Sequence, residues 1–311
     1  MNCIDELPGS TSAGVDPDGQ AGRPDWFDSA VSVDPDIAEV EVDGARISYR
    51  AWGEPSRPGI VLVHGGAANA CWWDHVAPWL CTDRRVVALD LSGHGHSDHR
   101  ERYDCAQWAD EVLAVAAAAG VAARPVVVGH SLGGFVTLQV AQQYGASLTG
   151  IVVIDSPVRG ASPEGAARLR GRAGLTARTY PTVDEIVGRF RPLPQDTELP
   201  CWLRDYLGLR SVRPVVDGYP WQFDPRIFAV VGLTPDDLTE LDCAVALVRG
   251  ERGFLSPGMS RELAARIGPD TLEVTVAGSG HHVMLDQPMA LTAELEAIAT
   301  QWLPAGPGKD H

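Results

Sequence analysis

The chain has 311 residues, 45% of them hydrophobic and 21% charged, which is typical of a globular protein that needs no disulfide or metal to hold its core together. Its 25 basic and 41 acidic side chains leave a net charge of −16, which disfavours binding to nucleic-acid phosphates or to anionic membranes. This charge is compatible with a small-molecule ligand, and it leaves a homodimer open.

Both ends of the chain are predicted to be tails. Residues 1–24 are rich in Gly, Pro, Asp and Ser and lack the features of a secretory signal, so we expect a disordered segment there and a flexible tail over 304–311. The six cysteines show neither C-x-x-C nor zinc-finger spacing, which predicts reduced thiols. Because no apolar run reaches the ~18 residues of a membrane span, we expect a cytoplasmic protein.

Short apolar runs alternate with helical stretches along the rest of the chain. A hairpin is expected over 38–52, strands at 60–63, 85–89, 126–128, 151–154, 245–248 and 272–276, and helices at about 71–80, 104–119, 132–144, 257–267 and 288–302. Since most of these strands are apolar on both faces, they predict an α/β fold with a mostly parallel sheet covered by helices on both sides.

The interval between the strands at 151–154 and 245–248 breaks this alternation. It is rich in arginine, proline and aromatic residues and has no convincing core strand. We expect residues 157–241 to form a mostly helical cap over the carboxyl ends of the strands, where open α/β sheets bind ligands. The core would then comprise residues 25–156 and 242–303.

The sharpest motif is Gly129-His130-Ser131-Leu132-Gly133, which follows a buried strand and runs directly into a helix. A turn this tight forces the serine into a strained conformation and needs glycine on both sides of it. The pattern predicts that Ser131 is a nucleophile raised above the sheet, at the amino end of the helix.

These residues resemble the α/β-hydrolase superfamily over roughly 38–303. His64-Gly65-Gly66 is similar to the motif that helps to form the oxyanion hole, so the resemblance implies donation from the backbone N–H groups of Gly66 and Leu132. The stretch from Asp90 to Ser97 resembles the D-x-x-G-x-G-x-S turn of the same superfamily, where His94 and His96 are packing residues. A metal cluster of His94, His96 and His99 is a weaker reading, and we expect neither metal nor organic cofactor.

The general base is expected after the last strand. Gly278-Ser279-Gly280-His281 resembles the family's G-x-G-H loop, and Pro288 lies seven positions after the histidine. This register selects His281 and leaves His282 in the pocket wall or behind the site. An imidazole suits the role because it accepts and returns a proton near neutral pH.

Two residues are candidates for the acid that orients this histidine. No aspartate occurs between Asp242 and Asp270, although the family usually has one after the seventh strand. Asp155, at the end of the sixth strand, and Glu251, at the tip of the seventh, could each hold the δ-nitrogen of His281. We favour Asp155 because its strand adjoins the nucleophile strand, and Glu251 remains the alternative.

A substrate pocket is expected around these groups. Trp72 and Trp73 are interpreted as packing of the first helix or as the entrance of the pocket. The other candidate pocket residues are His64, Gly65, His130, Trp202, Tyr206, Trp221 and His282. The aromatic side chains favour an apolar acyl group or ring.

Together these features predict a serine hydrolase that cleaves a carboxylic ester or lactone of a small to medium apolar substrate through an acyl-enzyme on Ser131. Other reactions of the resembling superfamily are alternatives, namely C–C bond hydrolysis and cofactor-free oxygenation. A ligand receptor that keeps the catalytic residues without turnover is a third. A haloalkane dehalogenase is disfavoured because it carries aspartate in place of Ser131.

Overall fold

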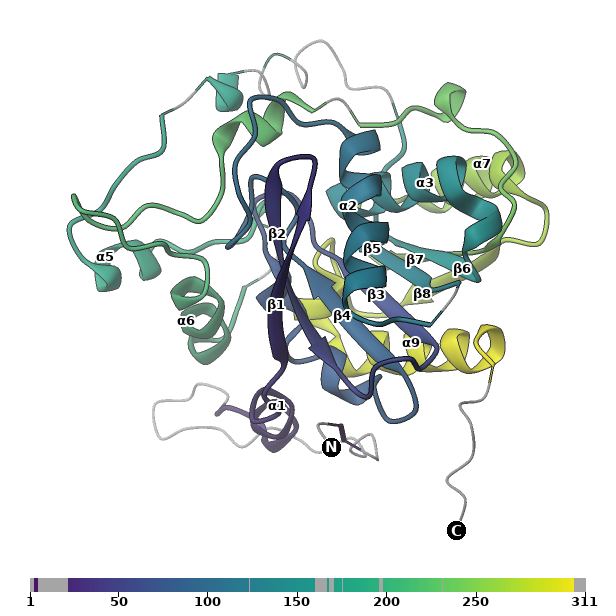
Figure 1. Ribbon diagram of the computed structural model, residues 1–311, viewed down its shortest axis with the longest axis horizontal. Helices are drawn as coiled ribbons and strands as arrows, with labels where there is room; N and C mark the ends of the chain where they lie inside the picture. The colour runs from purple at the N-terminus through teal and green to yellow at the C-terminus, as the bar shows by residue number, and fades with distance from the viewer. Residues whose placement is uncertain are drawn as a thin grey trace.

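A computed structural model describes residues 3–4, 22–122, 124–159, 167, 171–174, 176–195, 198–230 and 232–304. Eight strands form a single sheet (Figure 1): β1 (Asp36–Val42), β2 (Ala45–Trp52), β3 (Gly59–Val63), β4 (Arg85–Leu89), β5 (Val126–His130), β6 (Gly150–Ile154), β7 (Ala244–Gly250) and β8 (Leu272–Val276). Their spatial order is β1-β2-β4-β3-β5-β6-β7-β8. The hairpin β1–β2 and the pair β2–β4 are antiparallel, and the remaining neighbours are parallel. The predicted mostly parallel α/β fold is therefore confirmed.

Helices cover both faces of this sheet because its strands are apolar on both faces. In β3, Val61 and Val63 pack into one core cluster and Ile60 and Leu62 into the other. The first cluster is closed by α2 (Cys105–Ala118), α3 (Leu132–Tyr144) and α7 (Pro257–Ile267), and the second by α9 (Pro288–Trp302) together with α8 (Val283–Asp286). No helix in the described ranges is long and apolar enough to cross a membrane.

The helix expected at about 71–80 is instead two short 3₁₀ helices, η1 (Ala70–Trp73) and η2 (Ala77–Trp79). The side chain of Asn69 accepts a hydrogen bond from the backbone N–H of Cys71 and so begins η1. Pro78 has no N–H to continue a helical hydrogen-bond series, which accounts for the break before η2. Both 3₁₀ helices are buried against the second core cluster.

The segment between β6 and β7, where a mostly helical cap is expected, is described only in part. Its described part contains α5 (Val183–Val187), α6 (Cys201–Leu209), η4 (Pro225–Ala229) and η5 (Pro235–Asp237). Isolated antiparallel bridges join Tyr180 to Tyr219 and Val212 to Trp221, so part of the segment is held by strand-like contacts. Figure 1 shows α6 beside the β1–β2 edge of the sheet and α5 farther out on the same side.

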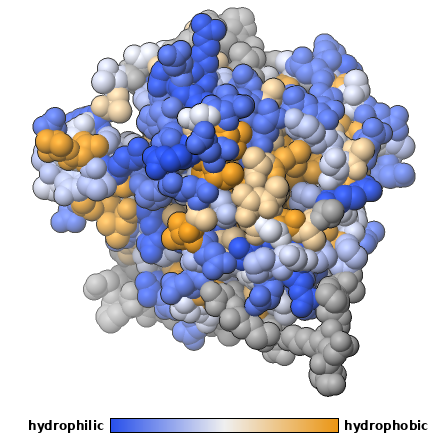
Figure 2. All heavy atoms as spheres, viewed as in Figure 1, coloured by the Kyte–Doolittle hydropathy of each residue, from blue (hydrophilic) through white to orange (hydrophobic). Residues whose placement is uncertain are grey.

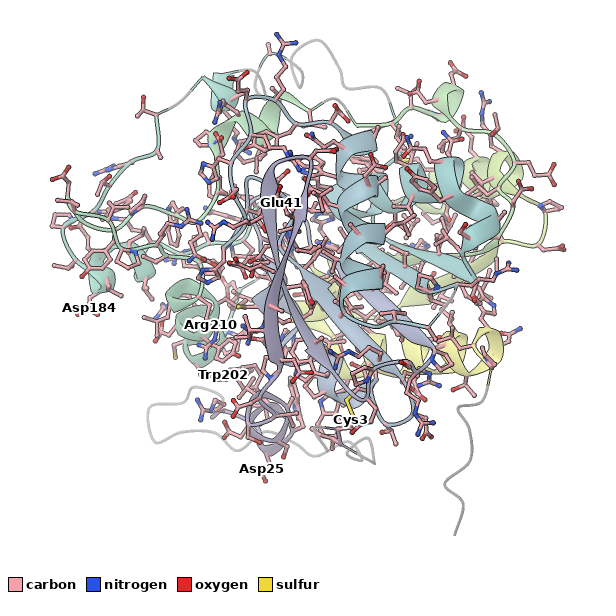
Figure 3. The ribbon with its side chains drawn as sticks, in the orientation of Figure 1. Cys3, Asp25, Glu41, Asp184, Trp202 and Arg210 are labelled. Atoms are coloured by element: carbon pink, nitrogen blue, oxygen red, sulfur yellow. A yellow bond between two sulfur atoms is a disulfide. The ribbon has the colours of Figure 1, made fainter. Side chains whose placement is uncertain are left out.

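The amino-terminal residues depart from two of our expectations. Cys3 and Cys81 are joined by a disulfide, so the prediction of reduced thiols is wrong for this pair (Figure 3). The backbone N–H of Ile4 donates to the carbonyl of Pro78, 3.2 Å away, and the hydroxyl of Thr82 donates to the carbonyl of Ile4. Cys3 and Ile4 are therefore attached to the core, whereas the rest of the predicted tail up to residue 21 lies outside the described residues. Residues 305–311 of the predicted carboxyl-terminal tail also lie outside them.

Removing this disulfide is expected to destabilise the protein. Cys3→Ser should lower the free energy of unfolding by about 2–4 kcal/mol, because the disulfide constrains the unfolded chain over a loop of 78 residues. Denaturant unfolding without reductant measures the loss. The variant should be insensitive to dithiothreitol, while the wild type with dithiothreitol should fall to the stability of the variant. Equal stability of both proteins without reductant would contradict the prediction.

Candidate active site

Ser131 lies at the sharp turn between β5 and α3. Its backbone has φ 53° and ψ −114°, a left-handed conformation that is rare for a residue with a side chain. The turn is closed by contact between backbones, since a Cβ on Gly129 would overlap the carbonyl oxygen of Gly133. Glycine is therefore required at residue 129, and the turn leaves the Ser131 side chain at the edge of the sheet.

His281 connects this serine to a carboxylate. Its Nε2 lies 3.0 Å from the Ser131 Oγ, and its Nδ1 lies 2.7 Å from the Asp155 Oδ2. The His281 ring and the Asp155 carboxylate are both buried. The serine and the acid thus lie on opposite ring nitrogens, which suits a base that takes a proton at Nε2 while Nδ1–H is held by an acid.

Asp155 is held by the loop that follows β7. The backbone N–H groups of Phe254 and Leu255 donate to its carboxylate over 2.7 and 3.2 Å, and the N–H of Gly250 is 3.3 Å away. A Cβ on Gly253 would overlap the same carboxylate, so only glycine allows the loop to approach this closely. The loop that usually supplies the family's acid instead supplies hydrogen bonds to an acid on the neighbouring strand.

Glu251, the alternative acid, has a different partner. Its Oε2 accepts a hydrogen bond of 2.8 Å from the backbone N–H of Gly278, and the residue is exposed. It therefore ties the loop after β7 to the loop after β8, a bracing contact between the two segments that carry the site.

Phe254 is a site residue that the sequence analysis did not identify. Its ring stacks on His281 with 4.5 Å between ring centroids and 27° between planes. The signal that could have identified it is its place in the loop after β7, three residues beyond Glu251. The stacked ring restricts how far the imidazole can tilt.

The predicted oxyanion donors lie side by side. Leu132 is the first residue of α3, so its N–H has no partner within that helix. A Cβ on Gly66 would lie 3.6 Å from the Leu132 side chain, which places the two residues in contact. A Cβ on Gly65 would lie 3.4 Å from the Ser131 Cβ. Two backbone segments thus meet next to the serine hydroxyl, as an oxyanion hole requires.

Two further histidines, His130 and His282, lie next to His281. His130 Nε2 lies 2.9 Å from the His281 carbonyl, and His282 Nε2 lies 3.2 Å from the Pro194 carbonyl. Burial, reinforced by the two neighbouring imidazoles, holds the pKa of His130 well below its usual value, so its ring is neutral at pH 7. Possible ligand atoms of His130, His281 and His282 lie within 4.8 Å of one another. A metal ion bound through His281 Nε2 would compete with Ser131 for that nitrogen.

The histidines of the 90–97 turn have structural contacts. His94 is buried, and its ring packs 4.7 Å from that of His64. His64 Nε2 accepts from the Leu91 N–H at 3.2 Å, and burial lowers the pKa of His64. His99 Nδ1 lies 3.7 Å from the Asp224 carboxylate. Asp90 organises the turn by accepting from the N–H of His96 at 2.8 Å.

A cavity of about 220 Å³ lies between the core and the segment inserted after β6. Gly66, Trp72 and Trp221 are the predicted site residues that line it. The other predicted pocket aromatics lie elsewhere: Trp73 is fully buried in the second core cluster, and Trp202 and Tyr206 pack on Phe27. His64 is likewise buried beneath the site rather than among the described residues that line the cavity.

Tyr206 instead belongs to a buried polar contact between α6 and the core. Its hydroxyl donates to Asp74 over 2.9 Å, and the same carboxylate accepts from Arg50 over 2.8 Å. Burial raises the pKa of the Asp74 carboxyl, and the adjacent Arg50 opposes the shift. Arg210 lies over the Tyr206 ring, 3.7 Å from its centroid. This cluster fastens the inserted segment to β2 and η1.

Loss of the Tyr206 hydroxyl should weaken this attachment. Tyr206→Phe is expected to lower the free energy of unfolding by about 1–3 kcal/mol, because a buried carboxylate loses a donor. Chemical denaturation measures the change. Tyr219→Phe is the matched control, since Tyr219 is held to Tyr180 through backbone hydrogen bonds. Equal stability of the Tyr206→Phe variant and this control would show that Asp74 does not depend on the hydroxyl.

Comparison with known proteins agrees with this geometry. Residues 60–295 match the model of the alpha/beta hydrolase family, and the chain belongs to that family. It is 32% identical over 270 residues to the esterase Rv0045c of Mycobacterium tuberculosis, with coverage of 82% of this chain and 87% of the relative. It is 33% identical over 250 residues to a pimeloyl-[acyl-carrier protein] methyl ester esterase of Vibrio atlanticus, covering 78% and 94%.

Solved structures support the same assignment. A structure of the Mycobacterium tuberculosis esterase Rv0045c superposes with a TM-score of 0.71 at 25% identity, over 87% of this chain and 94% of that one. The fold and the relatives together identify the chain as a hydrolase of the alpha/beta hydrolase family.

Proposed function

We propose that this protein hydrolyses carboxylic esters, including lactones, through an acyl-enzyme on Ser131. The observation that carries the proposal is the continuous contact from the Ser131 Oγ through His281 to Asp155, at 3.0 and 2.7 Å. The esterase relatives support ester bonds as the substrate class.

In the proposed reaction, His281 Nε2 takes the hydroxyl proton as the Ser131 Oγ attacks the ester carbonyl carbon. The N–H groups of Gly66 and Leu132 stabilise the negative charge that develops on the carbonyl oxygen. The imidazolium, held by Asp155, then returns the proton to the leaving alkoxide. Water activated by the neutral imidazole cleaves the acyl-enzyme, which releases the carboxylic acid and restores Ser131.

The test is a hydrolysis screen with product analysis. We expect turnover of p-nitrophenyl esters of short chain length and release of the acid from a lactone panel. Product masses distinguish ester cleavage from C–C bond cleavage or oxygen incorporation. Tight ligand binding with no product of any kind would indicate a receptor and contradict the proposal.

None of the proposed steps uses a metal ion. We therefore expect activity to be unchanged by EDTA, measured with the preferred ester before and after dialysis against chelator. Loss of activity that a divalent ion restores would contradict this prediction. A divalent ion that lowers activity would agree with competition for His281 Nε2.

A further inference from the structure

The cavity next to the oxyanion donors has a composition that the proposed reaction does not explain. Gly66 forms part of its wall, so the cavity begins beside the position of the substrate carbonyl. Its volume of about 220 Å³ lies below the range of about 300–1,000 Å³ that is usual for drug-sized ligands. It therefore suits a short substrate.

Aromatic rings form the apolar part of this cavity. The Phe190 centroid lies 6.2 Å from that of Trp72 and 5.9 Å from that of Trp221. Trp72 comes from η1 of the core, whereas Phe190 and Trp221 come from the inserted segment. A hydrocarbon chain that starts at the ester carbon would lie against these rings.

The charged groups that line the cavity are positive. Among the described lining residues they are Arg189 and Arg191, in a chain whose net charge is −16. Arg189 is partly engaged, 3.5 Å from Glu185 and 5.6 Å from the centroid of the Tyr180 ring. The Arg191 Nη1 donates to the backbone carbonyls of Gly188 and Phe190. A guanidinium has five N–H donors, so Arg191 retains donors for a bound anion.

One buried N–H group adds to this donor-rich wall. The Trp72 Nε1–H has no partner among the described residues, although the side chain is only 6% exposed. A buried N–H group without a partner is costly, and Trp72 lines the cavity, so a ligand oxygen that accepts from this group would satisfy it.

From this arrangement we infer that the preferred substrates are esters that carry a second, ionised carboxylate at the far end of a short hydrocarbon chain. Arg191 binds the carboxylate, with Arg189 and Trp72 beside it, and the aromatic rings bind the chain. A guanidinium pairs with a carboxylate through two parallel hydrogen bonds, which favours an anionic over a neutral terminus. The inference rests on the proposed ester hydrolysis and specifies its substrate class.

Matched pairs of esters test this inference. Monomethyl adipate has the carboxylate on the acyl side, and methyl hexanoate is its neutral counterpart. The acetate ester of 4-hydroxybutyrate has it on the alcohol side, and butyl acetate is its counterpart. Each hydrolysis releases one proton that a pH-stat records. We expect kcat/KM to be about 10–100-fold higher for the anionic member of at least one pair. Equal values within both pairs would overturn the inference and leave the proposed function standing.

Variants test whether Arg191 binds the carboxylate of the substrate. Arg191→Gln should lose about tenfold or more of the preference for the anionic ester, and Arg191→Lys should recover part of it because the charge returns without the planar fork. Arg204→Gln is the matched control, since Arg204 lies on α6 and pairs with Asp205. Activity on the neutral ester reports whether each variant is folded. An unchanged preference in Arg191→Gln would overturn the inference.

Binding separates the two proposals. Adipate should bind the Ser131→Ala variant in calorimetry, and the added change Arg191→Gln should weaken this binding about tenfold or more. Binding without hydrolysis of any ester would support carboxylate recognition and overturn the proposed function. Hydrolysis of neutral esters without adipate binding would do the reverse.

Discussion

Ser131→Ala is expected to reduce kcat for ester hydrolysis by roughly 10⁶-fold, as the loss of a nucleophile does in other serine hydrolases. The residual rate would come from the oxyanion donors and from substrate binding. The melting temperature should stay within a few degrees, because the Ser131 hydroxyl lies at the edge of the sheet and adds little packing. Discontinuous assays at high enzyme concentration measure the loss of kcat, and thermal unfolding verifies that the variant is folded.

Covalent labelling gives an independent measurement of the same residue. A fluorescent phosphonate should label the wild type and fail to label Ser131→Ala. Ser147→Ala is the matched control, because Ser147 is an exposed serine in η3 (Gly145–Ser147), after the same helix. Labelling of Ser131→Ala at the wild-type rate would exclude Ser131 as the nucleophile.

Asp155→Asn should cause the second-largest loss, about 10⁴-fold in kcat. An amide at this position favours the wrong tautomer of His281 and does not stabilise the imidazolium. Steady-state kinetics on the preferred ester measures the change. Because Phe254, Leu255 and Gly250 donate backbone hydrogen bonds to this carboxylate, circular dichroism should accompany the assay to verify that the variant is folded.

Glu251→Gln is the matched control for that variant. It carries the same carboxylate-to-amide change, in a residue that braces Gly278, and should cost less than about tenfold. A larger loss in Glu251→Gln than in Asp155→Asn would transfer the role of the acid to Glu251. Moderate and equal losses would mean that both carboxylates act on His281.

The fold was predictable because its signals are local. The strands at 85–89 and 272–276 and the helix at 132–144 have the predicted bounds, since each is an apolar run or a helical stretch set off by turns. The helix expected at 71–80 failed at Pro78, a residue whose effect on an apolar stretch depends on the packing around it. The disulfide between Cys3 and Cys81 could not be predicted from the sequence, because spacing along the chain does not reveal which cysteines lie together.

The site was predictable to the extent that its residues belong to turns. Ser131 and His281 lie in glycine-rich loops whose spacing is readable, and the structure brings their side chains together. The sequence left the acid open because Asp155 and Glu251 follow adjacent strands, β6 and β7. Only the path of the loop after β7 decides which carboxylate faces the imidazole. The structure of the inserted segment was the hardest part to predict. Contacts that join it to the core, such as Tyr206 with Asp74, leave no periodic pattern in the sequence.

The surface of the protein is mostly hydrophilic on the face shown in Figure 2. Figure 2 shows hydrophilic side chains around smaller hydrophobic groups on the face that includes α2 and α3. The two large clusters of buried residues lie on the two faces of the sheet, beneath this surface.

The contact between α1 (Asp25–Val31) and α6 has a consequence for synthesis on the ribosome. Phe27 is fully buried, with its ring 4.6 Å from Trp202 and 5.1 Å from Tyr206, and Figure 3 shows Trp202 on α6 next to α1. At about 5–20 residues per second, translation takes roughly 10–35 s to pass from the first of these rings to the last. During that interval the amino-terminal helix has no native surface from α6 to cover its phenylalanine. Nascent chains halted before residue 200 should therefore bind a chaperone that recognises exposed aromatic side chains, and chains extended beyond α6 should release it.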